Sequence, residues 1–173
     1  MLARLGWVIH YDDTAAVDAT HPEGRQAVFV GDLVDRGPDT PAVLRLVMGM
    51  VASGNALCVS GNPEAKLVRA LRGAKVTVSH GLAESLEQMA AESDDFNKQA
   101  LVFMDGLISH YVLDDGLLVV AHAGLKEPAT DDPPAVFARL RCTARQGPAS
   151  RVRIRAGGVG DLWCAHAPGL PHP

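Results

Sequence analysis

Apolar residues in the first two thirds of the chain alternate between short unbroken runs and helical spacing. The run QAVFVG at residues 26–31 is rich in β-branched and aromatic side chains and ends at a glycine, which predicts a buried strand. Residues 40–54 have apolar side chains three or four positions apart, which indicates one face of a helix. These apolar residues are Val43, Leu44, Val47, Met50 and Val51. We expect Thr40 as the N-cap, Pro41 as the first helical residue and Gly54 as the stop.

The same alternation continues along the next fifty residues. ALCVSG predicts a second strand at residues 56–61, and EAKLVRALRG predicts a helix at residues 64–73. Residues 82–108 predict one or two further helices. A polar break at ESDDF separates them, and Ser93 or Asp94 is the expected cap of the second helix.

The last patterned segment is HYVLDDGLLVVAHAG at residues 110–124, which predicts two strands joined by an Asp-Asp-Gly turn. Strands that alternate with helices indicate an α/β sheet protein. In such proteins, ligands bind at the carboxyl ends of the strands. Three polar motifs follow predicted strands, at residues 31–37, 61–62 and 121–124. We therefore expect these motifs to form one site.

Composition places the chain among soluble globular proteins. Its 173 residues predict one domain, and the hydrophobic and charged fractions of 47% and 21% are ordinary. A net charge of −4 argues against a nucleic-acid coat or a membrane-surface protein, and no apolar run is long enough to span a membrane. The amino-terminal residues lack a signal-peptide pattern. The three cysteines have no metal-site or disulfide spacing, so we expect a reducing cytoplasm.

The composition changes sharply near residue 127. Residues 1–127 contain 10 Lys and Arg against 17 Asp and Glu, whereas residues 128–173 contain six Arg, three acidic residues and seven of the 11 prolines. Hydrophobic periodicity also fades in the second segment. We therefore expect a domain at 1–127 and a poorly structured Pro/Arg-rich tail at 128–173. The alternative is a proline-rich extension that binds a partner.

The motif GDLVDRGPDT at residues 31–40 contains the first candidate site residues. Asp32 follows a predicted strand directly, and a carboxylate at such a position can bridge two hard cations. The planar guanidinium of Arg36 suits phosphate oxygens. Asp35 could accept hydrogen bonds from Arg36 or from a catalytic group. The alternative is a solvated Asp-Arg pair in a polar turn.

The other two motifs offer one candidate ligand each. Asn62 in SGNPE is a neutral oxygen donor at the next strand end, although Asn-Pro is also typical of an ordinary turn. His122 in VVAHAG could offer a ring nitrogen to a metal, although a lone histidine there is more often a core residue. Together with Asp32 and Arg36, these residues suit a binuclear metal site that hydrolyses phosphate esters.

GDLVDRGPD, GNPE and HAG resemble, in order and spacing, the motifs of the calcineurin-like metallophosphoesterases. Over about residues 2–127 the chain is similar to the phosphoprotein-phosphatase branch, and most similar to the phosphatase module of bacterial polynucleotide kinase-phosphatase. The resemblance implies a β-sandwich flanked by helices. It implies Asp32 as the bridging metal ligand, Asn62 and His122 as ligands of the second metal, and Arg36 as the phosphate-binding residue. Asp35 would support a catalytic histidine.

The chain departs from this family pattern in three places. The opening Asp-x-His motif on the first strand is absent, and residues 1–7 resemble the helix that follows that strand. Pro63 stands where the family has the histidine that protonates the leaving group, and proline has no proton to donate. A last metal-binding histidine is not recognisable after residue 127, where the composition resembles an out-of-frame translation. His166 is a weak candidate for it. We expect a partial fold that lacks the first motif strand.

The resemblance predicts a metal-dependent phosphatase with two divalent ions, which we expect to be manganese. The three departures predict that its activity is impaired. Its substrate would be a phosphorylated small molecule, a nucleotide or a phosphoprotein, and neither a membrane nor a nucleic acid is an expected partner. The alternative is a non-catalytic remnant that binds phosphate or metal, or an unstable fragment of such an enzyme.

Overall fold

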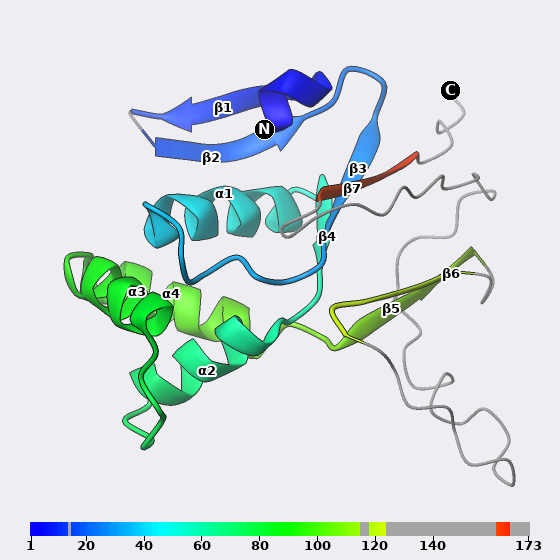
Figure 1. The fold of residues 1–173 in the computed structure, drawn as a ribbon. Coiled ribbons are helices and arrows are strands. Elements are labelled where there is room, and N and C mark those ends of the chain that lie inside the picture. The colour runs from blue at the N-terminus through cyan, green and yellow to red at the C-terminus, as the bar shows by residue number, and fades with distance from the viewer. Residues whose placement is uncertain (14, 115–117, 124–161, 167–173) are drawn as a thin grey trace, which may run out of the picture.

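The computed structural model describes residues 1–13, 15–114, 118–123 and 162–166, and Figure 1 shows the arrangement. These residues form a mixed α/β structure with four α-helices and three small sheets, so the predicted α/β class is confirmed. In chain order the elements are a 3₁₀-helix η1 (Leu2–Leu5), β1 (Val8–Asp12), β2 (Ala15–Thr20), β3 (Arg25–Phe29), α1 (Thr40–Ala52), β4 (Ala56–Cys58), α2 (Asn62–Leu71), α3 (His80–Ala90), α4 (Asp94–Asp105), β5 (His110–Leu113), β6 (Leu118–Ala121) and β7 (Leu162–His166).

The sheet that positions the site has the strand order β4-β3-β7. β3 and β4 are parallel and are joined through α1, so their carboxyl ends reach the same edge. β7 pairs with the other side of β3 in the antiparallel sense. The remaining strands form two antiparallel hairpins, β1-β2 and β5-β6.

Helix α1 lies between the β1-β2 hairpin and the helices α3 and α4 (Figure 1). Gly49 allows the hairpin to lie directly on this helix, because a Cβ atom there would be 1.6 Å from the carbonyl oxygen of Val17. Glycine inside a helix costs about 1 kcal/mol relative to alanine. This close approach of the two backbones explains its presence.

Two clusters of buried apolar residues hold the elements together. One joins α1 to α2, α3 and α4 and includes Leu44, Leu67 and Met104. The other joins α1 to the hairpin, the amino-terminal residues and the central sheet, and includes Met50 and Trp7. Because α1 contributes to both clusters, this helix joins the helical part of the core to the part formed by the hairpin and the central sheet.

Most predicted elements are present, with shifted ends. The strand predicted at 26–31 is β3, and the hairpin strands predicted at 110–124 are β5 and β6. Ser93 caps α4 as expected, since its Oγ accepts a hydrogen bond from the backbone N–H of Phe96 at 3.2 Å. Thr40 is not the cap of α1. That role belongs to Asp39, whose Oδ1 accepts a hydrogen bond from the N–H of Ala42 at 2.9 Å.

The α2 helix begins two residues earlier than predicted, at Asn62 rather than residue 64. Pro63 fits this first turn because the N–H groups there have no partner inside the helix. The strand predicted at 56–61 is correspondingly shorter, since β4 ends at Cys58. Cys58, in this strand, is 1% exposed and belongs to the core.

The β1-β2 hairpin was not predicted from the sequence. Residues 1–7, which we expected to correspond to the helix that follows the first motif strand, form only the short η1 turn before it. Residues 128–161 and 167–173 of the predicted tail lie outside the described residues, while 162–166 form β7. Among the described helices, none combines the length and hydropathy needed to cross a bilayer.

Candidate functional site

The loop that follows β3 has an unusual backbone. Gly31 has a φ of 82°, and three residues with side chains, Asp32, Asp35 and Arg36, also have positive φ values of 54°, 68° and 57°. The left-handed conformation costs roughly 1–2 kcal/mol for each L-residue with a side chain. Three such residues in one loop therefore require strong interactions with the surrounding structure.

The first half of this loop is held by Glu64, in the first turn of α2. Its carboxylate accepts hydrogen bonds from the N–H groups of Asp32 (3.2 Å), Leu33 (2.6 Å) and Val34 (3.2 Å). It also accepts one from the N–H of Gly61 at 2.7 Å, which ties the loop after β3 to the loop after β4. Burial raises the pKa of Glu64, and the N–H donors of Gly61, Leu33 and Val34 oppose that rise.

The second half of the loop is held by α3. Ser85 accepts a hydrogen bond from the N–H of Asp35 at 2.9 Å and donates one to its carboxylate at 3.1 Å. Gln88 accepts from the N–H of Thr40 at 2.7 Å and donates to the carbonyl of Gly37 at 3.1 Å. The carboxylate of Asp35 is therefore oriented by Ser85, an interaction that the sequence did not predict.

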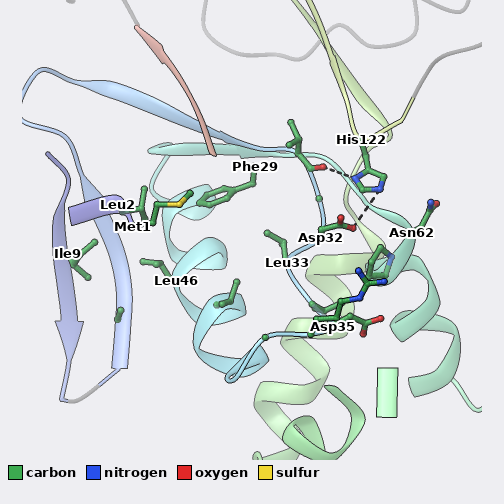
Figure 2. A pocket seen from close by; sticks show the side chains of 18 of the residues that line it. Met1, Leu2, Ile9, Phe29, Asp32, Leu33, Asp35, Leu46, Asn62 and His122 are labelled. Carbon is green, nitrogen blue, oxygen red and sulfur yellow. Dashed lines mark hydrogen bonds and ion pairs between the residues drawn. The ribbon is translucent and has the colours of Figure 1, made fainter. Parts of the chain in front are cut away.

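His122 follows β6 and reaches the loop after β3 (Figure 2). Its Nδ1 lies 2.8 Å from the carbonyl oxygen of Val30, and its Nε2 lies 3.7 Å from Oδ1 of Asp32. A carbonyl oxygen can only accept a hydrogen bond, so Nδ1 is the protonated nitrogen. In the neutral ring, the lone pair of Nε2 is then free to face the Asp32 carboxylate.

Two glycines permit this close arrangement. A Cβ atom on Gly31 would be 2.8 Å from Nδ1 of His122 and 2.8 Å from the backbone of Gly61. A Cβ atom on Gly61 would be 2.8 Å from the N–H nitrogen of Asp32. The sequence suggested that Gly31 allows a tight turn, and the structure adds that two strand-end loops touch at this point.

The predicted site residues line a single pocket of about 970 Å³. Its lining includes Asp32, Asp35, Arg36, Asn62, Pro63 and His122. Asn62 is the first residue of α2 and is exposed, and its side chain lies to one side of the Asp32–His122 pair (Figure 2). The pocket continues along an apolar wall that includes Ile9, Phe29 and Leu46.

The donors in the pocket fit a divalent cation in part. Asp32 offers a carboxylate oxygen and His122 a ring nitrogen, and two ligands of one ion at ~2.1 Å are roughly 3–4 Å apart. Their observed separation of 3.7 Å is in that range. Within the described part of the chain, however, no three His, Cys, Asp or Glu side chains form a metal-binding group. His166, the weak candidate for a further ligand, lies in β7, and its role as a ligand stays a prediction.

Sequence reasoning missed Glu64, Ser85 and Gln88. Glu64 had a usable signal, since a glutamate three residues after the residue that caps a helix is typical of a capping box. The contacts of Ser85 and Gln88 depend on how α3 packs against a distant loop. That packing leaves no local pattern in the sequence.

No protein-family model matches the chain. Among curated proteins it is similar to enzymes named bis(5'-nucleosyl)-tetraphosphatase PrpE [asymmetrical]. The protein from Bacillus subtilis (strain 168) is 41% identical over 110 residues, which is 61% of this chain and 45% of the relative. The protein from Anoxybacillus flavithermus is 38% identical over 111 residues, which is 61% of this chain and 45% of the relative. The protein from Halalkalibacterium halodurans is 38% identical over 111 residues, which is 62% of this chain and 45% of the relative.

The match to these relatives thus covers less than half of their length. Their shared name describes a phosphatase that acts on a dinucleoside tetraphosphate. The name does not refer to polynucleotide kinase-phosphatase, so that closer resemblance stays a prediction.

Proposed function

We propose that this chain is a metal-dependent phosphoesterase with a partial calcineurin-like fold, and that its reaction takes place at the ends of β3, β4 and β6. The observation that carries the proposal is the position of the His122 ring, whose Nε2 lies 3.7 Å from the Asp32 carboxylate while Nδ1 lies 2.8 Å from the carbonyl oxygen of Val30. Arg36 and Asn62 line the same pocket. Similarity to enzymes named as nucleotide phosphatases supports the same class of reaction.

In this proposal, Asp32, Asn62 and His122 would hold two divalent ions, with Asp32 as the ligand shared by both and Asn62 and His122 as ligands of the second. Bound ions of this kind polarise a phosphoryl group and supply hydroxide at neutral pH, and manganese is our candidate. Arg36 offers a guanidinium to the non-bridging phosphate oxygens. The hydrogen bond from Nδ1 of His122 to Val30 fixes the ring orientation, as partners of metal-binding histidines commonly do.

The substrate that we propose is a phosphorylated small molecule of the nucleotide class, because the relatives are named for a dinucleoside tetraphosphate. The pocket volume of about 970 Å³ is at the upper end of the range for small-molecule sites. We place the reaction in the cytoplasm, in keeping with the cysteine pattern.

We further propose that turnover is slow. Pro63 lines the pocket where a general acid is expected, and a positioned general acid contributes about 10²- to 10⁴-fold in rate. The described residues also supply only part of a metal-ligand set. The same observations favour a second candidate function, in which the pocket binds metal and phosphate without turnover.

Hydrolysis of p-nitrophenyl phosphate and of a dinucleoside tetraphosphate, each with and without Mn²⁺, tests the proposal. We expect slow release of product from at least one substrate, dependent on Mn²⁺ and lost in Asp32→Asn. Mn²⁺ binding without product release would instead establish the second candidate. Neither binding nor turnover, in a chain shown to be folded by circular dichroism, would contradict both.

A further inference from the structure

Glu64 is a fully buried acidic residue that does not line the pocket. Its side chain is 0% exposed and lies on the first turn of α2. Burying a carboxylate costs several kcal/mol unless other groups compensate for the lost water. Within the described residues, no Lys, Arg or His is at ion-pair distance from it. The hydrogen bonds that replace the lost water around this carboxylate therefore come from backbone groups.

The carboxylate is saturated by backbone N–H donors. Oε1 accepts hydrogen bonds from Leu33 at 2.6 Å and Val34 at 3.2 Å. Oε2 accepts from Gly61 at 2.7 Å and Asp32 at 3.2 Å. A carboxylate has about four lone-pair sites, so each is matched to one donor. This arrangement requires acceptors at both oxygens.

These hydrogen bonds join the two loops that carry the candidate ligands. Three donors belong to the loop after β3, where Asp32 has a strained φ of 54°, and the fourth belongs to Gly61, directly before Asn62. Without them, relaxation of Asp32 toward an ordinary backbone conformation would turn its side chain away from Nε2 of His122. Glu64 thus acts on the separation of the two candidate ligands without touching either side chain.

We propose that Glu64 is a positioning residue of this site, which holds the Asp32 carboxylate opposite His122 by binding four N–H groups from the loops after β3 and β4. The proposal rests on the proposed metal site. It assigns to the glutamate of GNPE a role in metal affinity, and not only in the stability of α2.

Glu64→Gln is the sharpest variant, because it keeps the size of the side chain but replaces one acceptor oxygen with an NH₂ group. Two backbone N–H donors then face another donor. We expect the affinity for Mn²⁺ alone, measured by calorimetry on the full chain, to fall about 10- to 100-fold, the usual effect of losing a partner that orients a ligand. The matched control is Glu87→Gln, the same change at an exposed position of α3, with unchanged affinity.

A loss of stability is separated from a loss of positioning by a second control. Met89→Ala removes a side chain from the α-helical core cluster, where Met89 is 1% exposed, and keeps all four hydrogen-bonding groups around the Glu64 carboxylate. We expect this variant to lose thermal stability but to keep its Mn²⁺ affinity while it is folded. If Glu64→Gln binds Mn²⁺ as tightly as the unsubstituted chain, Glu64 has no positioning role.

Hydrogen exchange of the metal-free, unsubstituted chain gives a test that needs neither a variant nor a metal. We expect the amides of Asp32, Leu33, Val34 and Gly61 to be protected, and rapid exchange at Leu33 and Val34 would overturn the proposal. Failure of the unsubstituted chain to bind Mn²⁺ would contradict the proposed function and the role of Glu64 in metal affinity together. Mn²⁺ binding with unprotected loop amides would contradict the role of Glu64 alone.

Discussion

Nε2 of His122 lies 3.7 Å from Oδ1 of Asp32, while Nδ1 of the same ring is 2.8 Å from the carbonyl oxygen of Val30. The contact with Val30 determines which nitrogen of the neutral ring carries the proton, and therefore what the ring presents to Asp32. Because the carbonyl can only accept, the neutral ring presents a lone pair to a carboxylate, and a cation between them would satisfy both groups.

This arrangement predicts the tautomer of His122. ¹⁵N NMR of the metal-free chain, at a pH where the His122 ring is neutral, should show the proton on Nδ1 and none on Nε2, and addition of the diamagnetic ion Zn²⁺ should shift the Nε2 resonance. His10, whose Nε2 lies 2.8 Å from the hydroxyl of Thr20, serves as the internal control and should be unchanged. A proton on Nε2 of His122, or equal shifts in both histidines, would contradict the assignment.

Gly31→Ala should destabilise the chain much more than Gly54→Ala. Both glycines have positive φ, 82° and 75°, so each substitution incurs the left-handed penalty of about 1–2 kcal/mol. Only at Gly31 would the new methyl group also meet Gly61 and His122, at 2.8 Å, whereas nothing lies within 4 Å at Gly54. We expect a further loss of about 1–3 kcal/mol, measured by urea unfolding. Equal losses would show that the two loops do not touch.

Pro63→His should raise the rate of phosphate-ester hydrolysis. Pro63 lines the same pocket as Asp35 and Arg36, so a histidine there would provide a proton donor near a bound phosphate. The increase should approach about 10²-fold or more if the new ring is well positioned. Pro22→His, at an exposed turn, should leave the rate unchanged. An unchanged rate in Pro63→His would mean that the missing acid is not what limits turnover.

Cys58 should remain an unreactive thiol at pH 8. Burial, with a smaller contribution from the Glu64 carboxylate, raises its pKa from 9.0 to about 12. As pH rises from about 9 toward 12, the unfolded chain loses this proton while the folded chain keeps it. Stability should therefore fall over that window, by at most about 1.4 kcal/mol per pH unit.

Thiol titration of a chain carrying Cys142→Ser and Cys164→Ser checks this expectation, since only Cys58 then reacts. Modification should require unfolding, and Cys58→Ala should flatten the loss of stability above pH 9. Rapid modification of the folded chain at pH 8 would show that the thiol is accessible.

The sequence predicted the proximity of Asp32 and His122 from the rule that ligands gather at the carboxyl ends of strands in an α/β sheet. The two residues do meet, although His122 follows β6 of a separate two-stranded sheet. That rule depends only on the order of strands and helices, which the hydrophobic pattern reveals. The assignment of these residues as metal ligands remains a prediction. It rests on the chemistry of their donors and on the resemblance.

The supporting contacts could not be predicted in the same way. Glu64 has the local pattern of an ordinary acidic helix start, and only the fold shows that it is buried under the loop after β3. The β1-β2 hairpin was missed because strand β1 (Val8–Asp12) is exposed at all but one position, which is partly buried. Such a strand lacks the alternation of apolar and polar residues by which a half-buried strand is recognised in a sequence. Its contact with α1 depends on Gly49, a feature of tertiary packing.

Mn²⁺ affinity of the unsubstituted chain and of Asp32→Asn, measured by electron paramagnetic resonance, tests the central claim most directly. Asn keeps the size of the side chain and one oxygen but removes the charge that would bridge two ions. We expect Mn²⁺ binding by the unsubstituted chain and affinity at least about tenfold weaker in Asp32→Asn, with the exposed Asp95→Asn unchanged. No binding by the unsubstituted chain, or equal affinity in all three, would contradict a metal site at these strand ends.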